Sequence, residues 1–103
     1  MRLSGRKIMT TKQRAYLKGL AMNIEPTFRI GKSSITPEFC EGIREILEAR
    51  ELVKVAVLNN CVDDPKELAS LLAERTGAEI VQVIGKRIVL YRESKTQKKI
   101  ILP

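Results

Sequence analysis

Three helix start signals, separated by apolar stretches rich in β-branched residues, constrain the fold of this chain more than any other feature. Thr10 and Gln13 form a capping box, while Thr36-Pro37 and Asp64-Pro65 each place an N-cap residue directly before a proline. Apolar residues at helical spacing follow each signal, most clearly over residues 37–50. The sequence therefore predicts three helices, and the apolar stripe of the first consists of Tyr16, Leu17, Leu20 and Ala21.

Strand patterns fill the intervals between these helices. Residues 28–30 alternate, residues 52–58 are almost continuously apolar, and residues 80–84 and 87–92 flank Gly85-Lys86, which suits a type II′ turn. The element order is α-β-α-β-α-β-β, in which two right-handed crossovers make the first three strands parallel. We therefore predict an α/β (α+β) two-layer fold with a four-stranded mixed sheet whose last strand is antiparallel. The first helix is expected to pack at one end, leaving one sheet face open.

The two ends of the chain carry weaker patterns. Residues 1–9 are expected to form a basic arm, and residues 10–103 a single domain, because a chain of 103 residues supports one core. Residues 94–103 hold three lysines followed by apolar residues. This segment is expected either to add an edge strand or to extend freely.

The absence of histidine removes the most common catalytic and metal-binding arrangements. The usual general base, the usual zinc ligand and the Ser/His or Cys/His nucleophile pairs all depend on it. Cys40 and Cys61 lack a CxxC spacing and are expected to be free thiols in a reducing compartment. No apolar run approaches the roughly 20 residues that span a bilayer. We expect a cytoplasmic protein without catalytic residues, cofactor, metal or membrane partner.

Charge is distributed unevenly along the chain, whose formal net charge is +7. Residues 1–32 carry eight basic groups and one acidic, residues 33–79 five and ten, and residues 80–103 six and one. If the two basic ends meet in the fold, they form one basic surface, which is typical of proteins that bind polyanions. Two solvated basic ends that meet nothing are the alternative.

A small basic loop, Gly31-Lys32-Ser33-Ser34, connects the first strand to the second helix. It resembles the end of a Walker phosphate loop, but Pro26 occupies the place of that loop's first glycine. The loop is therefore either a simple turn or a backbone-binding loop of the kind that KH modules use on nucleic acid.

Several pieces of the chain together resemble the CRM or YhbY-like RNA-binding domain, whose fold is similar to the C-terminal domain of bacterial translation initiation factor three. The matching pieces are residues 17–21, 30–36, 52–55, 76–78 and 83–92. The resemblance covers about residues 10–102. The family signature is a GxxG loop, in which Gly31 matches the first glycine and Ser34 stands at the second.

The resemblance implies RNA binding, and for stand-alone bacterial members it implies association with precursors of the large ribosomal subunit during ribosome assembly. We expect a monomer that contacts mainly the phosphate backbone and the shape of structured ribosomal RNA, because only four aromatic residues are present. The residues predicted to contact RNA are Lys12, Arg14, Lys18, Arg29, Gly31, Lys32, Ser33, Ser34, Lys86, Arg87 and Arg92.

Two other functions stay open on the sequence alone. One is a small nucleotide-binding enzyme built on Gly31-Lys32-Ser33, which the position of Pro26 disfavours. The other is an adaptor that binds a basic ribosomal protein through the acidic residues of the second helix, which are Glu38, Glu41, Glu45, Glu48 and Glu51.

Overall fold

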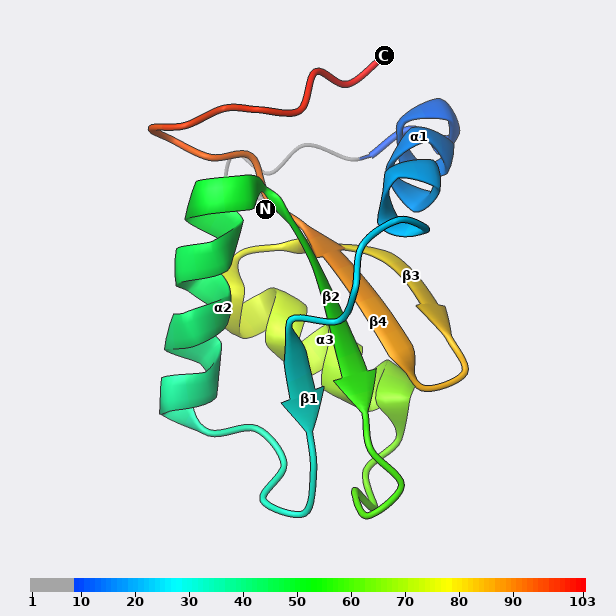
Figure 1. The fold of residues 1–103 in the computed structure, drawn as a ribbon, viewed down its shortest axis with the longest axis vertical. Coiled ribbons are helices and arrows are strands. Elements are labelled where there is room, and N and C mark those ends of the chain that lie inside the picture. The colour runs from blue at the N-terminus through cyan, green and yellow to red at the C-terminus, as the bar shows by residue number, and fades with distance from the viewer. Residues whose placement is uncertain (1–8) are drawn as a thin grey trace, which may run out of the picture.

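The computed structural model describes residues 9–103, which form three helices and four strands (Figure 1). The helices are α1 (Thr11–Ala21), α2 (Pro37–Arg50) and α3 (Pro65–Thr76). The strands are β1 (Phe28–Ile30), β2 (Leu52–Val57), β3 (Glu79–Ile84) and β4 (Arg87–Tyr91). The predicted class and element order are confirmed. The predicted basic arm lies, except for residue 9, outside the described residues.

The helices begin where the capping signals predicted. Thr10 and Gln13 form the complete capping box of α1, with the Gln13 N–H donating to the Thr10 hydroxyl at 3.0 Å. Likewise, the Thr36 side chain accepts the Phe39 N–H of α2 at 3.1 Å, and the Asp64 side chain accepts the Lys66 N–H of α3 at 3.3 Å. These side chains satisfy donors that have no partner inside the helix. None of the described helices is long and apolar enough to cross a membrane.

The strands form one sheet in the order β1-β2-β4-β3. The β1 and β2 strands pair in parallel, and β4 runs antiparallel to both of its neighbours, β2 and β3. The predicted strand directions are confirmed, with β4 inserted between β2 and β3. Gly85 has a φ of +55°, which the first central position of a type II′ turn requires.

The sheet buries apolar side chains on both faces. On the first face, Val53, Val55 and Val57 pack with α2 and α3 in the larger core. The second face carries the alternate residues of β2, including Leu52, and its smaller core includes Leu17 of α1. The expected position of α1 is thus corrected, because α1 packs on the second face in the smaller core. On the rest of this face Arg29, Ile84 and Arg87 are exposed, and we call this part of the second face the open half.

A β-bulge explains how α1 attaches to the edge of the sheet. The register of β3 shifts between Ile80 and Gln82, and Val81 joins the smaller core on the second face. The guanidinium of Arg14 donates to the carbonyls of Ile80 and Val81. It thereby satisfies acceptors at a place where a bulge disrupts the ladder. The predicted stripe of α1 is wrong at Tyr16, which is 43% exposed.

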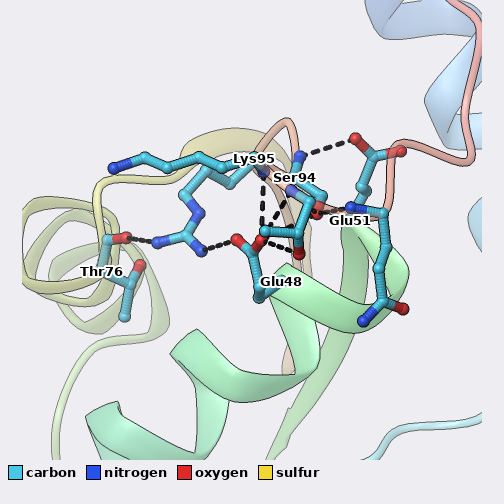
Figure 2. Close-up of polar contacts among 8 residues, drawn as sticks. Glu48, Glu51, Thr76, Ser94 and Lys95 are labelled. Carbon is cyan, nitrogen blue, oxygen red and sulfur yellow. Dashed lines mark hydrogen bonds and ion pairs between the residues drawn. The ribbon is translucent and has the colours of Figure 1, made fainter.

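The segment after β4 is neither an edge strand nor a free tail, because it folds back over the end of α2 (Figure 2). Glu51 is fully buried, and its carboxylate accepts the backbone N–H groups of Ser94, Lys99 and Ile100, each at 2.7 Å. Ile100 and Leu102 then pack against the smaller core. We call residues 92–103 the C-terminal strap.

Glu48, one turn earlier on α2, holds the beginning of the strap (Figure 2). Its carboxylate accepts the hydroxyls of Ser94 and Thr96 at 3.0 and 2.7 Å and the N–H groups of Lys95 and Thr96 at 3.1 and 3.0 Å. It also pairs with the Arg92 guanidinium at 3.0 Å. The strap is therefore fixed by two carboxylates at the end of α2, that of Glu48 in its last turn and that of Glu51 at its C-cap.

These contacts favour the ionised carboxylates. The Thr96 hydroxyl, aided by the Ser94 hydroxyl and two backbone N–H groups and opposed by burial, lowers the pKa of Glu48 from 4.5 to about 2. Burial alone would raise the pKa of Glu51, but the N–H groups of Ser94, Ile100 and Lys99 keep it below its ordinary value. Both glutamates therefore hold the strap as anions at neutral pH.

Candidate nucleic-acid interface

The loop after β1 forms a tight turn whose last residue has a left-handed backbone. The Ser34 N–H donates to the Gly31 carbonyl at 3.0 Å, and Ser34 has a φ of +58°. The Ser34 hydroxyl donates to the carboxylate of Asp63 at 2.6 Å. The position that corresponds to the second glycine of GxxG therefore has a backbone conformation typical of glycine, although serine occupies it.

Two further loops lie at the same end of the sheet. The Leu58 N–H donates to the Ile30 carbonyl at 2.8 Å, so the loop after β2 starts beside the loop after β1. An added Cβ at Gly31 would lie 3.4 Å from the Asn60 side chain. From the β3–β4 turn, the Lys86 ammonium donates to the Asn59 side-chain oxygen at 2.9 Å. The three loops thus meet at one end of the sheet, where Lys32 and Lys86 are exposed.

The open half of the second face continues from these loops. Arg29 of β1 and Arg87 of β4 both stand opposite Ala56 of β2, and residues opposite each other in a sheet share a face. Lys54, two residues before Ala56, lies on that face too. The strand positions of this half therefore carry basic charges without an acidic one.

The two predicted lysines of α1 are exposed. Lys12 lies in the first turn of the helix and Lys18 in its last turn. Figure 1 shows α1 at the end of the sheet on the side of the C-terminal strap, away from the three loops. The structure thus brings most of the other predicted residues to one end of the sheet, namely Arg29, Gly31, Lys32, Ser33, Ser34, Lys86 and Arg87.

Two predicted residues are held by intramolecular contacts instead. Arg14 is bonded to the carbonyls at the β3 bulge. Arg92 donates to the Thr76 carbonyl at 3.2 Å and pairs with Glu48 at 3.0 Å, so it points toward the acidic helix.

Tyr91 is buried on the second face, and burial, with smaller effects of nearby acidic groups, raises its pKa to about 12. It serves as core.

The acidic helix uses part of its charge internally. Glu48 and Glu51 hold the strap, and Glu41 pairs with Arg44 at 2.7 Å. Among the described residues, only Glu38 and Glu45 of the five predicted adaptor residues form neither an ion pair nor a hydrogen bond. The described residues also contain no group of three or more metal-ligating side chains.

Sequence reasoning missed Lys54, Asn59, Asn60 and Asp63 as neighbours of this surface. A signal existed for Lys54, because it is the one charged residue in the apolar run of residues 52–58. The loop residues gave none, because their proximity to Gly31 and Lys86 depends on how three separate loops meet.

This arrangement, a mixed sheet with a basic open half beside a Gly-Lys-Ser-Ser loop, defines a small basic α/β domain suited to polyanions. Comparison with known protein families identifies this class of domain more closely. Residues 9–92 match the CRS1 / YhbY (CRM) domain, and the chain belongs to this family.

Individual relatives cover nearly the whole chain. The Probable RNA-binding protein YqeI of Bacillus subtilis is 43% identical over 96 residues, which cover 93% of this chain and all of that protein. An RNA-binding protein of Haemophilus influenzae is 35% identical over 92% of this chain and 95% of that protein. The solution structure of SAV1595 from Staphylococcus aureus, named as a candidate RNA-binding protein, matches 93% of this chain and all of that chain, with a TM-score of 0.77 and 54% identity. These relatives are named as RNA-binding proteins, not as enzymes.

Proposed function

We propose that this protein binds RNA without catalysing a reaction, and that its target is ribosomal RNA in precursors of the large ribosomal subunit during assembly in the cytoplasm. The observation that carries the proposal is the open half of the second face, where Arg29, Lys54 and Arg87 gather without an acidic strand residue. The names of the relatives support RNA as the polyanion.

The basic surface is suited to phosphates because its charges are exposed and continuous with a small loop. Lys32 lies in the loop, Lys86 in the adjacent turn and Arg87 at the start of β4. Lysine and arginine bind phosphate through charge-assisted hydrogen bonds and release counterions from the RNA. Affinity should therefore depend strongly on salt.

The first experiment is a salt titration of RNA binding with a matched pair of charge reversals. If about four phosphates of a single-stranded segment are contacted, log K falls against log[salt] with a slope of about −3. K32E combined with R87E should weaken binding severely and make the slope shallower by about 1.4. The control combines K66E with R75E, which change the net charge equally. Both residues are exposed on α3, which packs on the other face of the sheet, so this double variant should alter affinity little.

Equal losses in the two double variants would contradict a specific surface, and absent binding to ribosomal RNA fragments at low salt would contradict RNA binding altogether. Crosslinking in cells, followed by sequencing of the bound RNA, tests the target. We expect enrichment of large-subunit ribosomal RNA, and enrichment of messenger RNA instead would overturn that assignment.

A further inference from the structure

Two large apolar side chains lie exposed on the basic open half of the second face. Ile84 is 62% exposed and Leu58 is 39% exposed. Ile84 stands opposite Arg87 in the sheet, and Arg87 stands opposite Ala56. Leu58 follows the end of β2, and its Cδ1 lies 3.6 Å from the position that a Cβ would take on Gly31, two residues after Arg29. Aliphatic and guanidinium groups therefore alternate across this surface.

The dimensions of this surface suit a short stretch of extended chain. Arg29, Ala56, Arg87 and Ile84 form one row across all four strands. Neighbouring strands lie about 4.8 Å apart, so the row spans about 14 Å. In the RRM, another RNA-binding module, a four-stranded sheet binds two or three bases through aromatic side chains.

The mixture of basic and apolar side chains on this surface distinguishes duplex RNA from unpaired RNA. Duplex RNA presents phosphates, 2′-hydroxyls and base edges in its shallow minor groove, and its base faces are stacked inside the helix, out of reach of an exposed isoleucine. Unpaired nucleotides also present base faces, which pack against apolar side chains and stack on guanidinium planes. Basic charge alone would suit either form, whereas Ile84 and Leu58 suit unpaired bases.

The aromatic residues are placed elsewhere and leave this role to aliphatic groups. Phe28 and Phe39 pack edge to face on the first face, with ring centroids 5.4 Å apart. Tyr91 is buried, and Tyr16 lies on α1. Base contact on the open half must therefore come from Ile84, Leu58 and the arginines.

We infer that the open half of the second face is a site for unpaired nucleotides, in which Arg29 and Arg87 bind the backbone and stack on bases while Ile84 and Leu58 contact base faces. This inference rests on the proposed RNA-binding function and names the form of RNA that the sheet accepts.

The test compares a short unstructured RNA oligonucleotide with a blunt RNA duplex that contains the same sequence. I84S and L58S should each weaken binding of the single strand by about five- to tenfold and alter duplex binding less than about twofold. The matched control is I101S in the C-terminal strap, where the isoleucine is 83% exposed. It should change neither affinity by more than about twofold.

Methyl NMR provides a measurement that needs no substitution. Ring currents of the bases should shift the Ile84 and Leu58 methyl resonances when the single strand is added, and the Ile101 resonances should stay in place. Equal effects of I84S on both RNAs, or unshifted Ile84 methyls in the bound protein, would overturn the inference. If the inference failed in this way but R87Q weakened the binding of both RNAs, the proposed RNA-binding function would stand. Binding of neither RNA by the unaltered protein would defeat both.

Discussion

Ser34 combines a left-handed backbone with a side chain that is bonded to another loop. A non-glycine residue at positive φ costs about 1 kcal/mol or more relative to glycine. The hydrogen bond from the Ser34 hydroxyl to Asp63, at 2.6 Å, offsets this cost and ties the loop after β1 to the loop before α3. The pair thus compensates for the missing glycine of the GxxG signature.

The compensation predicts a dependence between the two positions. D63A should lower the free energy of unfolding by about 1 kcal/mol when Ser34 is present, because the strained serine loses its partner. In the S34G background, the same D63A change should cost only a few tenths of a kcal/mol, because glycine has no hydroxyl and the hydrogen bond to Asp63 is already absent. Urea denaturation of the four proteins measures both values. Equal costs in the two backgrounds would show that the bond does not support the loop.

Glu51 carries a second residue-scale prediction. Its carboxylate is the acceptor for the N–H groups of Ser94, Lys99 and Ile100. Leaving a buried donor unpaired costs about 1–3 kcal/mol, so E51A should lower the free energy of unfolding by at least about 2 kcal/mol. E45A removes an exposed glutamate from the same helix and should stay within about 0.5 kcal/mol. A comparable loss in both variants, measured by urea denaturation, would contradict the role of Glu51.

At the scale of elements, the C-terminal strap depends on the ionisation of Glu48 and Glu51 at the end of α2. The folded pKa of Glu48 is about 2, below its ordinary value of 4.5, and the pKa of Glu51 is lowered as well. A carboxylate with a depressed folded pKa stabilises the fold above its ordinary pKa and loses this contribution as the pH falls through the folded value. The strap should therefore loosen in acid.

We predict that the Lys95 and Thr96 amide resonances, which report hydrogen bonds to Glu48, move toward random-coil positions as the pH falls from about 5 to 2. E48Q should place these amides near their acid positions already at neutral pH and remove most of their pH dependence. Amides of β2 serve as the internal control. Simultaneous loss of strap and β2 signals would indicate global acid unfolding instead.

The elements themselves were predictable because their signals are local. Capping residues, prolines and apolar periodicity gave the helices, and the Gly85 turn gave the hairpin. The insertion of β4 between β2 and β3 was not predictable, because it depends on pairing between distant segments. The position of α1 and the exposure of Tyr16 follow from that sheet, so they were missed as well.

The exposed loop lysines of the candidate site were predictable from the sequence, whereas the partners of its arginines were less so. Lys32 and Lys86 lie in short turns, where exposure follows from local sequence. Arg14 and Arg92 have the same residue type, yet they find carbonyl and carboxylate partners across the fold. Composition cannot separate a cation that meets solvent from one that satisfies an internal acceptor, because the partner lies far away in sequence.

For the whole molecule, the two cores share one sheet and should unfold together. Leu17 is fully buried in the smaller core, and L17A should cost about 2–5 kcal/mol. A domain of this size then loses roughly 10–30 °C in melting temperature, in a single transition. Y16A changes the adjacent, 43% exposed residue and should shift the midpoint much less. Two separate transitions in L17A, by circular dichroism and calorimetry, would contradict the coupling.

The smaller core joins the two ends of the described chain, since Met9 packs against it together with Ile100 and Leu102, and Gln13 donates to the Pro103 carbonyl at 3.2 Å. The larger core, in contrast, is built from residues 28–90. The smaller core needs residues 9–24 to meet residues 100–102. Contacts between segments so far apart in sequence carry a large loop-closure entropy, so we expect the packing of α1 with the strap to form late in folding, after most contacts of the larger core.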